Sequence, residues 1–164
     1  MKKIAYSALS FILLIIINGC TGYEPIFGTS GLQFKIADYS IEGDRILGQK
    51  IYSRLYNLSK SEKSDQNLRS LEFVIKVSKD KKVTAKDSAG KILEYNIILY
   101  TDLKVTDIVT EDRILDQVFI SSLTYKVQNN YSDTVSLENS TVENLLNKTY
   151  QDLLIIMSKN MSTE

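Results

Sequence analysis

The stretch LEYNIILYTDLKV, residues 93–105, decides the fold of this chain. Apolar side chains recur along it at every second position, which is the period of a β-strand with one buried face. The opposite face carries Ile98 and Tyr100 among its polar residues, so it is more apolar than a solvated face requires. The residues expected to share the buried face are Leu93, Tyr95, Ile97, Leu99, Leu103 and Val105.

Two more alternating segments lie on either side of this strand. Residues 71–78 precede it across a polar connector at residues 79–89, and residues 115–127 follow it across a turn at residues 107–112. Because consecutive strands with short connectors pair as neighbours, the three strands are predicted to form an antiparallel meander. Its face away from the core would carry Val74, Ile92, Ile98, Tyr100, Val118 and Ile120.

Helical periodicity appears on both sides of the meander. Asp44 is the expected N-cap of a first helix, and Ser140-Thr141-Val142-Glu143 has the form of a capping box that would begin a second. Alternation at residues 32–39 predicts a strand before the first helix. The order β-α-β-β-β-α predicts an α+β two-layer sandwich, with both helices on one face of a mostly antiparallel sheet. The apolar stripes are Leu47, Ile51, Leu55 and Leu58 in the first helix, and Val142, Leu145, Leu146, Thr149, Leu153, Ile156 and Met157 in the second.

The N-terminus has the features of a secretory signal. Two lysines at residues 2–3 precede a largely apolar run at residues 5–17, which is too short for a bilayer-spanning helix of about 20 residues. The run leads into Ile17-Asn18-Gly19-Cys20, which resembles a lipobox, the signal whose cysteine is lipidated. The alternative is an ordinary signal followed by a buried free cysteine.

A lipobox implies three segments. Residues 1–19 would be a signal peptide that is removed, residues 20–31 the lipidated cysteine and its tether, and residues 32–164 a single α+β domain. Acyl chains such as palmitate on Cys20 would anchor the protein to a membrane, and the only thiol would be unavailable for a disulfide. Loss of the two N-terminal lysines would leave a net charge near −2, which gives no electrostatic reason to expect nucleic acid as a partner.

The residue types exclude most catalytic chemistry. The chain has no histidine, so Ser-His-Asp triads, Cys-His pairs and imidazole-based zinc sites are excluded. No glycine-rich phosphate loop and no calcium loop is present in the sequence. The acid pairs Asp38 with Glu42 and Glu111 with Asp112 fall at predicted turns and caps, where carboxylates are ordinarily solvated. We therefore expect a protein that is not an enzyme and holds neither metal nor cofactor.

Five lysines crowd the predicted connector between the first two strands of the meander. One interpretation is a site for anionic headgroups or phosphates, because ammonium groups act as point charges that suit a diffuse phosphorylated surface. The other is a soluble hairpin tip protected by lysines. The residues are Lys79, Lys81, Lys82, Lys86 and Lys91.

The segment Gly22-Tyr23-Glu24-Pro25-Ile26-Phe27-Gly28, together with the lipobox cysteine and the order of predicted elements, resembles the LPS-assembly lipoprotein family LptE, in particular its alphaproteobacterial branch. The resemblance implies a lipoprotein of the outer membrane that faces the periplasm. It would plug the β-barrel protein LptD, assist its assembly and contact lipopolysaccharide, with the five lysines as candidate contacts. Thr21 after the cysteine, in place of aspartate, is similar to lipoproteins released to the outer membrane.

Two other functions stay open on the sequence. An unrelated small lipoprotein that scaffolds another envelope complex would have the same anchor and the same fold class. A periplasmic enzyme with a carboxylate site would need buried, close-set acids, which the alternation pattern does not provide.

Overall fold

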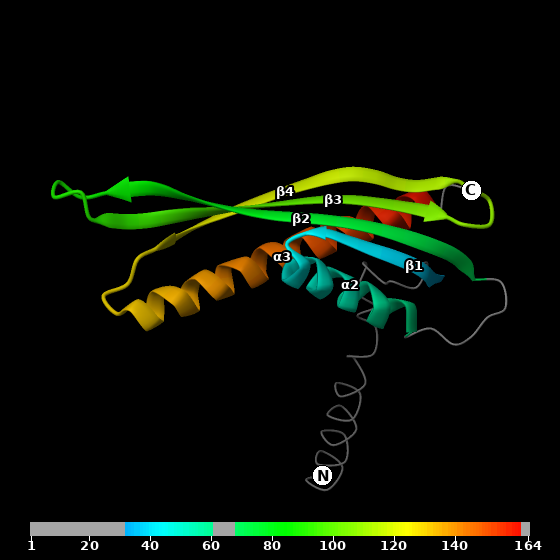
Figure 1. The fold of residues 1–164 in the computed structure, drawn as a ribbon, viewed down its shortest axis with the longest axis horizontal. Coiled ribbons are helices and arrows are strands. Elements are labelled where there is room, and N and C mark those ends of the chain that lie inside the picture. The colour runs from blue at the N-terminus through cyan, green and yellow to red at the C-terminus, as the bar shows by residue number, and fades with distance from the viewer. Residues whose placement is uncertain (1–31, 61–67, 162–164) are drawn as a thin grey trace, which may run out of the picture.

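The computed structural model describes residues 32–60 and 68–161. Four strands and two helices follow in the predicted order β-α-β-β-β-α, and both helices lie on one side of the sheet (Figure 1). This confirms the α+β fold class. The elements are β1 (Phe34–Gly43), α2 (Arg45–Lys60), β2 (Arg69–Lys86), β3 (Ile92–Asp107), β4 (Arg113–Lys126) and α3 (Tyr131–Met161).

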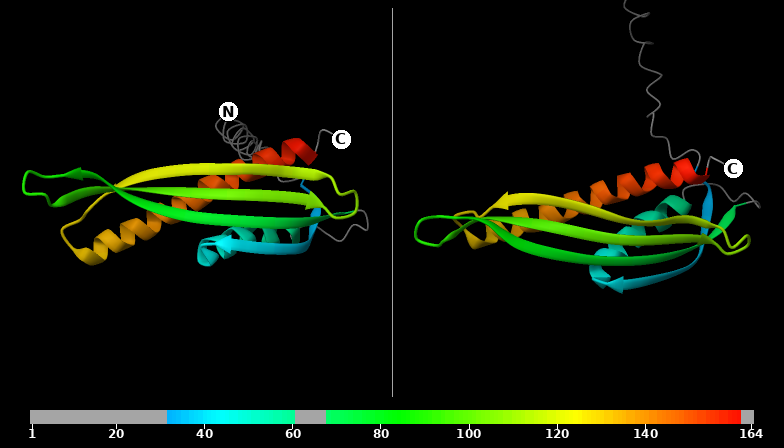
Figure 2. Two further views of the ribbon diagram at one scale, coloured as in Figure 1. Left: turned by 45° about the horizontal axis from the view of Figure 1, so that its top comes forward. Right: turned by 90° about the horizontal axis from the view of Figure 1, so that it is seen from above.

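The sheet is mixed, with strand order β1-β2-β3-β4. β2, β3 and β4 form the predicted antiparallel meander. β1 runs parallel to β2, because α2 carries the chain across the sheet between them. α2 packs against β1 and β2, while the long α3 crosses the same face of the sheet obliquely and packs mainly against β4; both helices lie behind the sheet in Figure 2. The opposite face of the sheet has no described helix over it.

The core lies between the sheet and the helices. All four residues predicted for the stripe of α2 are buried, from Leu47 to Leu58. Phe34 of β1 and Phe73 of β2 meet at the centre, with ring centroids 5.7 Å apart. Fully buried strand residues around them include Leu71, Ile75, Val77, Ile97, Leu99, Leu103 and Val105.

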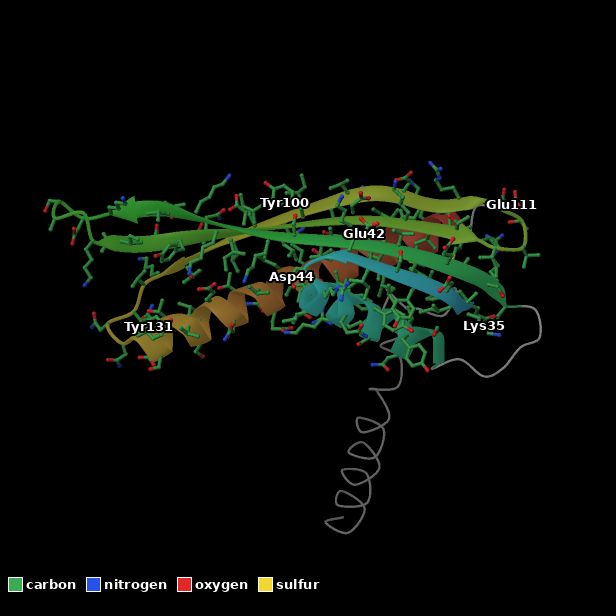
Figure 3. All side chains as sticks on the ribbon, in the orientation of Figure 1. Lys35, Glu42, Asp44, Tyr100, Glu111 and Tyr131 are labelled. Carbon is green, nitrogen blue, oxygen red and sulfur yellow. The ribbon has the colours of Figure 1, made fainter. Side chains whose placement is uncertain are left out.

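The connection from β1 to α2 is built as the sequence predicts. The Asp44 carboxylate accepts hydrogen bonds from the backbone N–H groups of Ile46 and Leu47, both at 3.1 Å, which makes Asp44 the N-cap of α2. Figure 3 shows Asp44 where β1 passes into the helix. Gly43 precedes it at a φ of 75°, a left-handed conformation that glycine adopts most easily.

The predicted polar connector at residues 79–89 is wrong. β2 continues to Lys86, and only residues 87–91 turn the chain into β3. The hairpin projects beyond the start of α3 (left in Figure 1), and most residues from Lys79 to Lys86 are exposed on either face. Alternation of apolar and polar residues indicates a strand only where one face of the strand is buried. Because neither face is buried in the outer part of β2, the sequence there lacks the pattern although the strand continues.

The predicted capping box at residues 140–143 is also wrong. α3 begins at Tyr131, and Ser140 lies exposed in its interior. The first helical hydrogen bond of the region joins Thr134 N–H to the Asn130 carbonyl at 3.2 Å. The first buried residue of α3 is Thr141, so the helix runs for ten residues before it reaches the core. An apolar stripe therefore indicates where a helix meets its sheet and not where the helix begins.

The first strand is displaced from its predicted range. It spans Phe34–Gly43, with a register irregularity between Ile36 and Asp38, so Tyr39 and Ile41 take over the face that Phe34 began. The predicted signal peptide, the lipidated Cys20 and the tether at residues 20–31 lie outside the described residues.

Candidate functional site

The five candidate lysines do not form one surface. Lys79 and Lys81 pair across the sheet with Leu99 and Ile97, so they lie on the helix side, whereas Lys82 pairs with Asn96 on the open side. The other two lie further out: Lys86 is the last residue of β2, and Lys91 lies in the turn. The cluster seen in the sequence is thus divided between two faces and a tip.

Lys81 makes contacts with α3 and with two tyrosine rings, although the residue itself is exposed. Its Nζ lies 2.5 Å from Oε2 of Glu138 on α3 and 4.1 Å from the centroid of the Tyr95 ring. The Tyr125 hydroxyl donates to the same Glu138 oxygen at 2.8 Å, and the Tyr95 and Tyr125 rings stack at 5.8 Å. We call these four residues the Lys81 cluster. It joins β2, β3, β4 and α3 at the base of the hairpin and stabilises the position of the hairpin relative to the helix.

Lys81 and Glu138 each stabilise the charged form of the other. Burial by itself would raise the pKa of the Glu138 carboxyl, but hydrogen bonds from Lys81 and Tyr125 and the ammonium groups of Lys81 and Lys79 outweigh it and hold the pKa below its ordinary value. Burial would likewise lower the pKa of Lys81, and its contacts with Glu138 and Tyr125 raise it instead. The ion pair is therefore present at neutral pH.

Substituting Glu138→Gln is expected to lower the free energy of unfolding by about 1 kcal/mol at neutral pH, because the pair is partly solvated. Since the pKa of Glu138 is lower in the folded state, the stabilisation is complete above the ordinary value of 4.5 and is lost as the pH falls through the folded value. Urea unfolding of both proteins at several pH values should show the difference shrinking in acid. The exposed Glu111→Gln variant is the control. A Glu138→Gln deficit that persists unchanged at low pH would contradict the ion pair.

The open face of the sheet carries an apolar patch. Tyr100 lies directly opposite Ile120 in the β3–β4 register, and Ile98 and Val118 occupy the diagonal positions. Val118 is 53% exposed and Ile120 is 64% exposed. We call these four residues the open-face patch; Figure 3 shows Tyr100 on the side of the sheet away from the helices. Polar residues border the patch, among them Asn96, Asp102, Lys104, Ser122 and Thr124.

β4 is the edge strand beside this patch, since β3 is its only strand neighbour within residues 32–60 and 68–161. Residues 117–125 of β4 include no charged side chain, although charges are the usual protection of a free edge. A groove of about 390 Å³ runs between this edge and α3, and Ile155 of α3 lines it with 53% of its surface exposed. The open face and its edge thus offer a mixed surface for a protein partner.

The acid pairs considered in the sequence lie at the surface. Asp38, Glu42, Glu111 and Asp112 are all exposed. Among residues 32–60 and 68–161, no group of three or more acidic, cysteine or histidine side chains is placed to hold a metal ion. Within the same ranges, no helix combines the length and the apolarity needed to cross a bilayer.

Two comparisons find no relative and the third finds the fold. No family model matches the chain, and no curated protein matches it. A structure from Caulobacter crescentus CB15, described as a putative lipoprotein, aligns with a TM-score of 0.55 at 9% identity, over 82% of this chain and 95% of its own. A minor lipoprotein from Acinetobacter baumannii aligns with a TM-score of 0.50 at 10% identity, over 75% and 91%. The chain therefore has a fold also found in proteins described as bacterial lipoproteins.

No sequence pattern indicates the Lys81 cluster as a unit. Glu138 and Lys81 are 57 residues apart, and Glu138 fell in a region predicted to precede the last helix. The one usable signal is Tyr95 on the predicted buried face of the meander, which lies directly opposite Tyr125 in the β3–β4 register.

Proposed function

We propose that this protein is a lipid-anchored, non-enzymatic component of the outer membrane. It would plug an LptD-like β-barrel, assist the assembly of that barrel and contact lipopolysaccharide during transport. The observation that carries the proposal is a lipobox at Cys20 ahead of a domain whose fold is shared with proteins described as lipoproteins. The resemblance of residues 22–28 to the LptE family supports the particular partner.

The open-face patch is the proposed barrel contact. The interior of a barrel is lined by polar and aromatic groups, so a plug needs a surface that mixes apolar, hydroxyl and amide side chains. The patch has this composition together with its border, which holds Asn96, Ser122 and Thr124 as well as the charged Asp102 and Lys104. The uncharged edge of β4 extends the same surface with backbone donors and acceptors.

The lysine contacts with lipopolysaccharide need revision on this proposal. Lys81 is paired with Glu138, and Lys82 lies 3.3 Å from its neighbour Asp80. Lys86 and Lys91, both exposed near the hairpin tip, are the better placed candidates for an anionic headgroup. The hairpin would then present its charge away from the anchored body of the domain.

Site-specific photocrosslinking in cells tests the proposed face. A photoreactive residue in place of Ile120 should crosslink the protein to a large β-barrel, whereas one in place of Lys148, 62% exposed on α3, should do so weakly. If only the photoreactive residue at position 148 crosslinks to the barrel, the contact lies on the helix layer and the proposed open-face contact is wrong. Crosslinks from position 120 to a different envelope protein would favour the alternative function, a lipoprotein that scaffolds another complex.

A further inference from the structure

A second surface lies between the helices, away from both the hairpin and the open-face patch. α2 and α3 border a groove of about 680 Å³. One face of α2 supplies most of the lining, since residues 45, 46, 49, 50, 53 and 54 recur at helical spacing, and Glu143 lines it from α3. Because the two helices are held by different parts of the sheet, the groove is fixed by the fold.

The groove carries an excess of positive charge. Three cationic side chains, Arg45, Lys50 and Arg54, line it against the single carboxylate of Glu143. Lys50 pairs with one oxygen of Glu143, and Arg54 lies 3.2 Å from the other. Asp44 is adjacent in sequence, but its carboxylate accepts the capping hydrogen bonds of α2. Two positive charges in the groove are therefore not balanced by its own acid.

Contacts with Tyr150 hold Arg54 in place, but one nitrogen of its guanidinium group makes no hydrogen bond. Its guanidinium carbon lies 6.0 Å from the centroid of the Tyr150 ring, and the Tyr150 hydroxyl donates to the Arg54 carbonyl at 3.4 Å. Nη1 of Arg54 is buried and has no hydrogen-bond acceptor among the described residues. A buried donor of a charged group without an acceptor is costly, so Glu143 satisfies the hydrogen-bonding capacity of Arg54 only in part.

We propose that this groove binds a phosphate monoester, with Arg45, Lys50 and Arg54 as its ligands. A phosphate monoester carries close to two negative charges at neutral pH and offers three acceptor oxygens, which match the two unbalanced positive charges and the N–H donors of the three cationic side chains. Glu143 would compete with the ligand for the same cations. The inference depends neither on a barrel partner nor on the hairpin lysines.

Binding is tested with the full-length protein in a neutral detergent, titrated with inorganic phosphate and with mixed micelles containing phosphatidic acid or phosphatidylcholine. We expect phosphatidic acid to bind and phosphatidylcholine not to bind. The double variant Arg45→Gln, Lys50→Gln should weaken binding by at least about tenfold, the effect of roughly 1.4 kcal/mol. Glu143→Gln should strengthen it severalfold, because it removes the competing carboxylate.

The matched control is Lys35→Gln, Lys104→Gln, which removes two exposed charges outside the groove. It should bind like the wild type. Equal weakening by both double variants would show attraction to the overall charge and overturn the site, as would an unchanged or weakened affinity in Glu143→Gln. If inorganic phosphate displaces phosphatidic acid at a similar concentration, the groove is a site for the free ion. If only the phosphatidic acid micelles bind, the groove is a site for a phosphorylated headgroup. Binding of neither probe would overturn the proposal, and circular dichroism of each variant verifies that it is folded.

Discussion

Replacing Phe73 with alanine is expected to lower the free energy of unfolding by about 3 to 5 kcal/mol. The Phe73 side chain is fully buried at the centre of β2 and packs against the Phe34 ring of the neighbouring strand. Its loss removes apolar contacts and leaves a cavity between sheet and helices that the rigid strands cannot close. Equilibrium urea unfolding followed by circular dichroism measures the change.

The control for this substitution is the adjacent residue on the other face. Val74 points to the open face and is half-buried, so Val74→Ala should lower the stability by much less than Phe73→Ala. A similar loss for the two variants would mean that both faces of the sheet are covered. That result would contradict the two-layer architecture with a single core.

The substitution Gly43→Ala is expected to destabilise the protein by roughly 2 to 5 kcal/mol, the sum of two effects. The left-handed φ of 75° is unfavourable for any residue with a Cβ atom. In addition, a Cβ at this position would lie 2.2 Å from the carbonyl oxygen of Val77, which accepts the hydrogen bond from Asp44 N–H at 2.7 Å. The clash therefore falls on backbone that joins β1, β2 and the start of α2.

Gly90 provides a matched control for the clash. It has a similar φ of 83°, but a Cβ there would meet no atom within 4 Å. Gly90→Ala should therefore show only the conformational effect, about 1 to 2 kcal/mol. Urea unfolding measures both variants. If Gly43→Ala and Gly90→Ala lower the free energy of unfolding by the same amount, Gly43 does not lie as close to the Val77 carbonyl as described.

The fold could be predicted where one face of an element is buried or where the contacts that define the element are local in sequence. Alternation in residues 71–78 and 93–105 located the meander because one face of each strand meets the helices. Asp44 located the start of α2, since a cap acts through hydrogen bonds within a few residues. The same signals failed for the outer part of the hairpin and for the first ten residues of α3, where no residue of the helix and few of the hairpin are fully buried, so that burial leaves no pattern.

The candidate site was predicted less completely, because its contacts are long-range. The lysines at residues 79–86 are close in sequence, but this predicted connector is part of a strand, so neighbouring lysines point to opposite faces of the sheet. The pairing of Lys81 with Glu138 depends on where α3 passes below the hairpin, and no local pattern encodes that position. The open-face patch was visible beforehand, because the excess of apolar residues on that face is a property of the alternation itself.

The anchor and the exposed face have complementary roles in the proposed function. A lipid at Cys20 would restrict the domain to the membrane surface and raise its effective concentration near a membrane partner. The open-face patch would then need only modest affinity of its own. The Lys81 cluster would keep the projecting hairpin at a fixed angle to that face.

Purification of the lipidated protein from detergent-solubilised outer membranes tests the proposed function most directly. We predict that a large β-barrel protein of the LptD kind copurifies in a one-to-one ratio and is identified by mass spectrometry. A protein that elutes alone, or with a different envelope complex, would contradict the plug function and leave the α+β domain without an assigned partner.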